Sequence, residues 1–157
     1  MNDEYFRKKM MTKDISSDFI NLNFTGIKLN PDKITGVLGI EPNTISSSNE
    51  IVQTASGSKQ RTKLGSWIFG FEFDESVNIT EQLTYLANYF SGKEKELKEI
   101  SSWDSVEHTF LDVVINPAPD YGTHSVLLNS KDVAFWGAVG IDICCTFWNP
   151  YIFEKSE

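Results

Sequence analysis

Cysteine is scarce in this 157-residue chain, and its two cysteines, Cys144 and Cys145, are adjacent. Adjacent cysteines do not make the spaced disulfide framework of small secreted domains, so we expect a reduced, cytoplasmic protein. The first residues, MNDEYFRKKMMTKD, lack the apolar core of a secretory signal. No apolar run approaches the roughly 18 residues of a membrane span, so the sequence predicts no membrane association.

Positive charge is also in short supply. The chain has 14 Lys and Arg against 22 Asp and Glu, which gives a net charge of −8. A duplex DNA binder needs a broad basic face to displace counterions, so this composition argues against a nucleic-acid partner. Apolar residues make up 40% and charged residues 23%, which are globular proportions. We predict one domain over residues 18–150, between a polar N-terminal arm, 1–17, and a C-terminal tail, 151–157.

Three stretches carry the start and stop signals of helices. The first has an N-cap and a first-turn proline at Asn30-Pro31 and ends at Gly39. The second opens with the capping-box spacing of Asn78 and Glu81 and continues its apolar stripe to residue 100 across a Ser-Gly pair. One long helix with a weak point and two short helices both fit that second stretch. The third runs from about 129 to 140 and is expected to bury Val133, Trp136 and Val139.

Period-two alternation predicts four strands, near residues 20–25, 67–73, 108–115 and 141–148, with a short one at 125–128. The second of them points four aromatic side chains to one face, which helices must cover: Trp67, Phe69, Phe71 and Phe73. The fold class is therefore α+β, with a single mixed, mostly antiparallel sheet and helices packed on one face, a two-layer sandwich. The Ser-, Thr- and Gly-rich residues 43–65 are predicted to be a functional loop or a disordered segment.

The order of these segments resembles a known bacterial family. The resemblance is carried by Leu38-Gly39-Ile40-Glu41-Pro42 at a helix end, by the Trp67 strand and by HSVLLNSKDVAFWGAVGIDI, a closing helix that leads into a strand with Asp142 near its start. Over about residues 18–148 the chain resembles the family called domain of unknown function 4279. That resemblance implies a small intracellular domain with no assigned activity, and it supplies no catalytic residues.

Neither metal binding nor nucleophilic catalysis has a motif here. The soft ligands His108, His124, Cys144 and Cys145 show neither Cys-x-x-Cys nor His-Glu-x-x-His spacing, so we predict no metal and no cofactor. There is no Gly-x-Ser-x-Gly elbow. Both cysteines lie in the middle of a strand, where packing is their usual role, and we expect Cys145 to be a small core residue. We predict no catalytic residue.

Two acids, Asp112 and Asp142, interrupt otherwise apolar strands. Neighbouring carboxyls can share a proton, but we favour the interpretation that both point to solvent on the open sheet face. Phe110 and Trp148 fall on the same face, and an aromatic, acidic face suits a protein partner. The alternative is that an extra helix or the N-terminal arm covers these aromatics as ordinary core.

The leading functional hypothesis is a non-enzymatic, acidic, cytoplasmic domain that binds another protein with a basic surface. An immunity-type or antitoxin-type role is its sharpest version. The alternative is a small-molecule or anion-binding domain, or an enzyme, that uses loop cations together with Trp67 and His124. Those cations are Lys59, Arg61 and Lys63.

Overall fold

The computed structural model describes residues 18–53, 59–74, 76–116 and 126–147. The predicted arm, 1–17, and tail, 151–157, lie outside these ranges. The described elements follow the chain in this order: β1 (Phe19–Gly26), α2 (Pro31–Leu38), β2 (Thr44–Ser46), β3 (Ile51–Gln53), β4 (Lys59–Arg61), β5 (Gly65–Gly70), α3 (Ile79–Phe90), α4 (Glu94–Ser101), β6 (His108–Ile115), α5 (Ser130–Ala138) and β7 (Asp142–Phe147).

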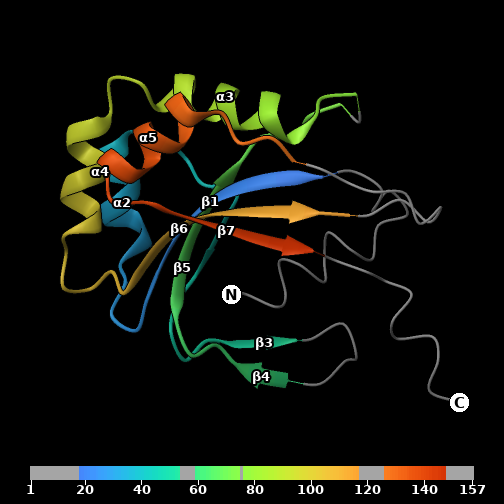
Figure 1. Ribbon diagram of the computed structural model, residues 1–157. Coiled ribbons are helices and arrows are strands. Elements are labelled where there is room, and N and C mark those ends of the chain that lie inside the picture. The colour runs from blue at the N-terminus through green and yellow to red at the C-terminus, as the bar shows by residue number, and fades with distance from the viewer. Residues whose placement is uncertain (1–17, 54–58, 75, 117–125, 148–157) are drawn as a thin grey trace, which may run out of the picture.

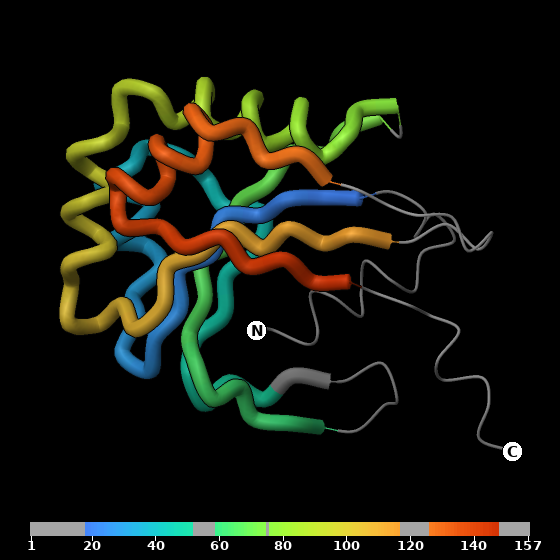
Figure 2. Tube along the Cα trace, in the orientation of Figure 1, coloured from blue at the N-terminus to red at the C-terminus, as the bar shows by residue number. Residues whose placement is uncertain are grey.

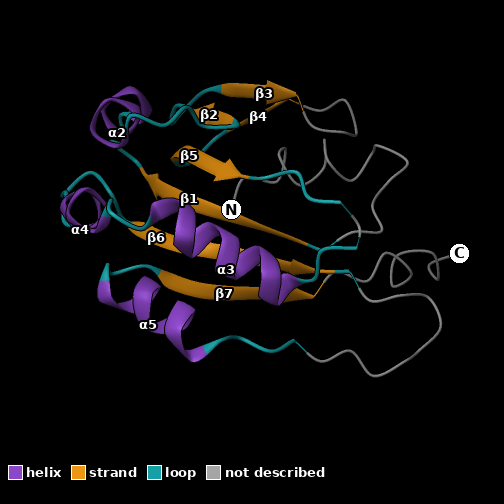
Figure 3. Ribbon diagram, turned by 90° about the horizontal axis from the view of Figure 1, so that it is seen from above, coloured by secondary structure: helices purple, strands orange, loops and turns teal. Residues whose placement is uncertain are grey.

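Five of the strands form one sheet in the order β2-β5-β1-β6-β7. Every neighbouring pair is antiparallel except β6 and β7, which are parallel. In Figures 1 and 3, α3 and α5 lie over one face of the sheet, while α2 and α4 stand at one end. This arrangement confirms the predicted α+β fold with a mixed, mostly antiparallel sheet.

The helix termini lie where the capping residues predicted them. The Asn30 side chain accepts a hydrogen bond from the Lys33 backbone N–H, and Gly39 ends α2 in the left-handed conformation with φ 65°. At the start of α3 the side chain of each capping-box residue, Asn78 and Glu81, accepts the backbone N–H of the other. The second helical stretch is two helices, because the chain breaks at Gly92 with φ 89°.

The aromatic row faces the helices, as predicted, but the strand that carries it is shorter than expected. Trp67 and Phe69 lie in the core, whereas β5 ends at Gly70. The Gly70 N–H donates to the Asn43 side chain at 2.6 Å instead of to a longer neighbouring strand. Phe71 and Phe73 therefore lie beyond the strand, half-buried against the core.

The prediction that residues 43–65 lack regular structure was wrong. They contain β2 and the β3–β4 hairpin, and Figure 2 traces the chain out to the hairpin and back into β5. Polar side chains here bond the backbone and so stabilise the turn. Thr62 makes several of these bonds, and its hydroxyl donates to the Ser47 carbonyl oxygen at 2.6 Å. Its backbone N–H donates to the Glu50 carbonyl oxygen, and its own carbonyl oxygen accepts the Asn49 N–H.

Three smaller predictions about the C-terminal part also fail. Val133 is 38% exposed because α5 turns it outward, whereas Trp136 and Val139 are buried as expected. Residues 126–128 do not form a strand; the Leu127 carbonyl oxygen instead accepts a hydrogen bond from the Thr80 hydroxyl of α3 at 2.6 Å. Cys145 is exposed and not a core residue, because β7 is the last strand of the sheet.

Trp67 is fully buried, its ring stacks near Phe69, and its Nε1–H donates to the Thr35 hydroxyl at 3.1 Å. We expect Trp67→Ala to lower the free energy of unfolding by about 3–5 kcal/mol, through lost burial and a cavity. Urea unfolding measures this, with Tyr85→Ala, at an exposed ring, as the control. A loss below about 1 kcal/mol in Trp67→Ala would contradict the core assignment.

Two glycines offer a matched pair of alanine substitutions. A Cβ on Gly26 would collide with the backbone carbonyl oxygen of Ser105, so Gly26→Ala should destabilise by more than about 2 kcal/mol. Gly36 lies within α2 with nothing inside 4 Å of the added Cβ. Gly36→Ala should therefore stabilise by about 0.5–1 kcal/mol, because alanine favours the helix. Thermal unfolding of both variants checks the opposite signs; equal effects would contradict the close approach at Gly26.

Candidate functional site

The sheet face that points away from α3 and α5, which we call the polar face, carries buried polar side chains. Those with 6% exposure or less are Asn21, Asn23, Thr25, Ser46, Ser66 and Asp112. Half-buried Cys144 and Thr146 continue this face on β7. Exposed polar residues are ordinary, but buried ones are informative, because each must find a partner or weaken the fold. The polar face is therefore the first place to look for a function.

Asp112 lies at the centre of the polar face. On β6 it sits opposite Asn21 of β1 and Cys144 of β7, and the Thr146 hydroxyl donates to its Oδ1 at 3.2 Å. Burial raises the pKa of Asp112 to about 6, although the hydrogen bond from Thr146 opposes this. The expectation that Asp112 points to solvent was wrong, since it is only 2% exposed.

Asp142 behaves differently from Asp112. It is exposed at the start of β7, opposite Phe110, while Asp112 is opposite Cys144. The two carboxyls therefore occupy different register positions, and the hydrogen bond of Asp112 goes to Thr146 instead of to a second acid. Of the two acids, only Asp142 is exposed to solvent.

A pocket of about 450 Å³ opens where β6 and β7 begin. It is lined by Glu107, His108, Thr109, Phe110, Asp142 and Cys144. The Ile27 N–H donates to Glu107 Oε1 at 3.0 Å, which holds that carboxylate in place. The Thr109 hydroxyl donates to the Gly140 carbonyl oxygen at 2.8 Å and ties β6 to the turn before β7. The pocket therefore combines two carboxylates with the half-buried ring of Phe110.

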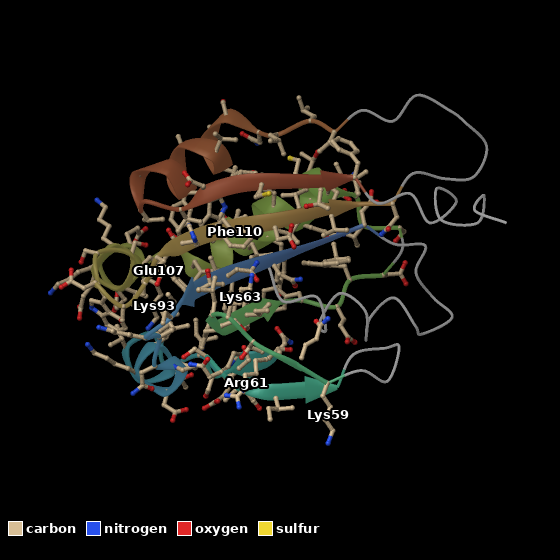
Figure 4. The ribbon with its side chains drawn as sticks, turned by 90° about the horizontal axis from the view of Figure 1, so that it is seen from below. Lys59, Arg61, Lys63, Lys93, Glu107 and Phe110 are labelled. Carbon is tan, nitrogen blue, oxygen red and sulfur yellow. The ribbon has the colours of Figure 1, made fainter. Side chains whose placement is uncertain are left out.

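The predicted loop cations do not join this pocket. Lys59, Arg61 and Lys63 are exposed on and beside the β3–β4 hairpin, and Figure 4 shows Lys59 at its far end, directed away from the sheet. Trp67 is buried, so it does not line a cleft with them. Two further predicted site residues, His124 and Trp148, lie outside the described residues.

The sequence did not assign Glu107, His108, Thr109 and Cys144 to a common site. Their meeting depends on the parallel pairing of β6 with β7, which period-two patterns do not reveal. A second missed feature is an aromatic cluster in which Tyr85 and Tyr89 of α3 pack edge-on against Phe71 at 4.9 Å. The spacing of these tyrosines, four residues apart, was the available signal.

A larger cavity, about 650 Å³, lies at the start of α3, where Asp18, Glu81 and Leu127 are among its lining residues. Its two carboxylates already serve the fold. Asp18 Oδ1 accepts the Asn116 N–H at 2.8 Å, and Glu81 Oε2 accepts the Asn78 N–H at 3.1 Å. This cavity is therefore a weaker candidate than the pocket beside Phe110.

Both cysteines are free thiols. Although Cys145 is exposed, partial desolvation of its sulfur raises the pKa of the thiol, and neighbouring Cys144 and Asp112 raise it further. A thiol that resists ionisation is a poor nucleophile. Within the described ranges, no group of three His, Cys, Asp or Glu side chains is placed to hold a metal ion.

Comparison with known proteins gives one result. The family model described as "Domain of unknown function (DUF4279)" matches residues 17–148, which confirms the resemblance noted in the sequence. Neither the curated proteins nor the solved structures gave a match. Among the described helices, none has the length and apolar character to span a bilayer.

The burial of Asp112 predicts a specific dependence of stability on pH. Its pKa is raised from 3.8 to about 6 in the folded state, so the folded protein holds this proton more tightly than the unfolded chain. The stabilising contribution is present below about pH 4 and is lost as the pH rises through about 6. The side chain introduced by Asp112→Asn stays neutral and can accept the hydrogen bond from Thr146. Between pH 4 and pH 8 the free energy of unfolding of this variant should therefore rise by up to about 3 kcal/mol relative to that of the wild type. Urea unfolding from pH 4 to 8 measures this difference, and a constant difference would contradict it.

Proposed function

Because the chain belongs to the DUF4279 family, whose description names no activity, we propose from its own surfaces that it is a binding domain for another protein. The pocket beside Phe110 receives a basic side chain of that partner. The partner lies against the edge of the polar face, where β6 and β7 begin. The proposal makes the protein a non-enzymatic domain of the cytoplasm, where Cys144 and Cys145 stay reduced.

The composition of the pocket carries this proposal. Asp142 and Glu107 supply carboxylates, Phe110 supplies an aromatic ring, and Lys and Arg are missing from its described lining residues. A lysine or arginine head group is stabilised by carboxylates through charge-assisted hydrogen bonds and by a ring through cation–π attraction. The net charge of −8 adds long-range attraction for a basic protein.

The sharpest form of the proposal is an immunity-type or antitoxin-type domain that blocks a basic surface of a toxin. The alternative, an anion or small-molecule site built on Lys59, Arg61 and Lys63, has less support. Lys59 and Arg61 lie on the hairpin and Lys63 just after it, and none of them lines the pocket beside Phe110. Trp67, which that alternative requires at a cleft, packs in the core.

Site-specific photocrosslinking tests the proposal. A photoreactive amino acid at position 110 in the native cell should give one discrete adduct with a basic protein. The same group at Tyr85, which is 52% exposed on α3, is the control and should give none. With the partner purified, Asp142→Lys should slow association roughly tenfold, and Glu41→Lys, an equal charge change at another exposed acid, by less than about twofold.

Three results would contradict the proposal. One is an adduct from position 85 and none from position 110. Another is an acidic partner. The third is an association rate that does not change with salt between low and physiological ionic strength, since steering by exposed charges is screened by salt.

A further inference from the structure

β7 forms one edge of the five-stranded sheet. Among the described strands β7 pairs only with β6, and its six residues include no proline, lysine or arginine. Natural proteins protect exposed edges with such residues or with very short strands. The opposite edge is protected in this way, since its strand β2 has only three residues. Beyond the end of β2, the Gly70 N–H of β5 donates to the Asn43 side chain and so is not left free.

On its helix side β7 itself carries no charged side chain. Ile143, Cys145 and Phe147 share the helix side of β7, and Phe147 is 68% exposed. In Figures 1 and 3, α5 lies beside and above β7. Besides Ser130 and Lys131, its exposed residues are small or apolar: Val133, Ala134, Gly137 and Ala138. A solvent-facing helix surface is normally polar, so these residues indicate a surface that becomes covered.

The other side of β7 carries the charge. Asp142 is exposed there and lines the pocket together with Phe110 and Cys144. A strand added beside β7 would alternate its side chains between the two sides. One set would contact Phe147 and Val133, and the other would lie next to Asp142.

We propose that β7 and α5 form a slot for an extended segment of the protein partner, which pairs with β7 as an added strand. The inference rests on the proposed function and specifies the partner: alternate side chains of the segment are apolar and contact α5, and one between them is a lysine or arginine that reaches Asp142. Strand addition satisfies the free backbone groups of an edge, and alternate pockets give specificity. A second copy fits less well, because its β7 offers no basic side chain to Asp142 and both copies carry −8.

A library of displayed random peptides is the probe. Selected peptides should alternate apolar and basic residues, and their binding should change the amide NMR shifts of residues 142–147 and 130–138.

Binding of the peptides to variants is measured by fluorescence anisotropy. The double variant Val133→Asp, Phe147→Asp should weaken binding at least tenfold, because both side chains are exposed in the slot. Ile45→Asp, at a 53% exposed residue of the β2 edge, is the control and should change binding less than twofold. Asp142→Asn should weaken only the peptides that contain lysine or arginine. Unchanged melting temperatures show that each variant is folded.

Four outcomes would overturn the inference. They are a selection without binders, shift changes confined to α3, a dimer that Phe147→Asp dissociates, and peptide binding that requires deletion of residues 148–157. The last two would assign the slot to a second copy or to the chain itself.

The failure of this inference can be told from the failure of the proposed function. If the crosslinked partner binds the Val133→Asp, Phe147→Asp variant normally, this inference fails and the proposed function stands. If peptides pair with β7 while position 110 gives no adduct, the proposed function fails and the slot stands.

Discussion

The central strand β1 sets the constraint on which the other elements depend, because it is covered on both faces. It pairs with β5 and β6, and every residue from Ile20 to Gly26 is buried. Its apolar side chains pack under the helices, while Asn21, Asn23 and Thr25 alternate with them on the polar face. The sheet therefore has an apolar side packed under the helices and a second side lined with buried polar groups.

Buried polar groups cost stability unless they are hydrogen-bonded, and the polar face limits that cost locally. The Asn23 side-chain amide donates to the Asn21 carbonyl oxygen at 3.0 Å, and the hydroxyls of Ser46 and Ser66 lie 2.8 Å apart. Asp112 remains the costly member, since burial disfavours its charge. The pocket beside Phe110 and the β7 edge lie next to this buried face, and together they form the binding surface that we propose.

Local signals predicted most of the fold. Caps at Asn30, Asn78 and Asn129 and alternation around Trp67 and Leu111 depend on neighbours in sequence, so they were readable. The β3–β4 hairpin was not, because its order comes from side chain–backbone bonds centred on Thr62. The site was predictable only in part. The alternation of side chains along each strand indicated that Phe110 and Asp142 share a face of the sheet. The order of the strands, which the sequence does not reveal, places these two residues opposite each other and buries Asp112.

The helix side of the sheet holds the fold, and we propose that the pocket beside Phe110 and the β7 edge bind the partner. Amide hydrogen exchange, compared between the free protein and its complex with the crosslinked partner, tests it most directly. Binding should slow exchange at 108–110 and 142–147 and leave the exposed side of α3, around Tyr85 and Tyr89, unchanged. Slower exchange confined to α3, with none at β7, would contradict it.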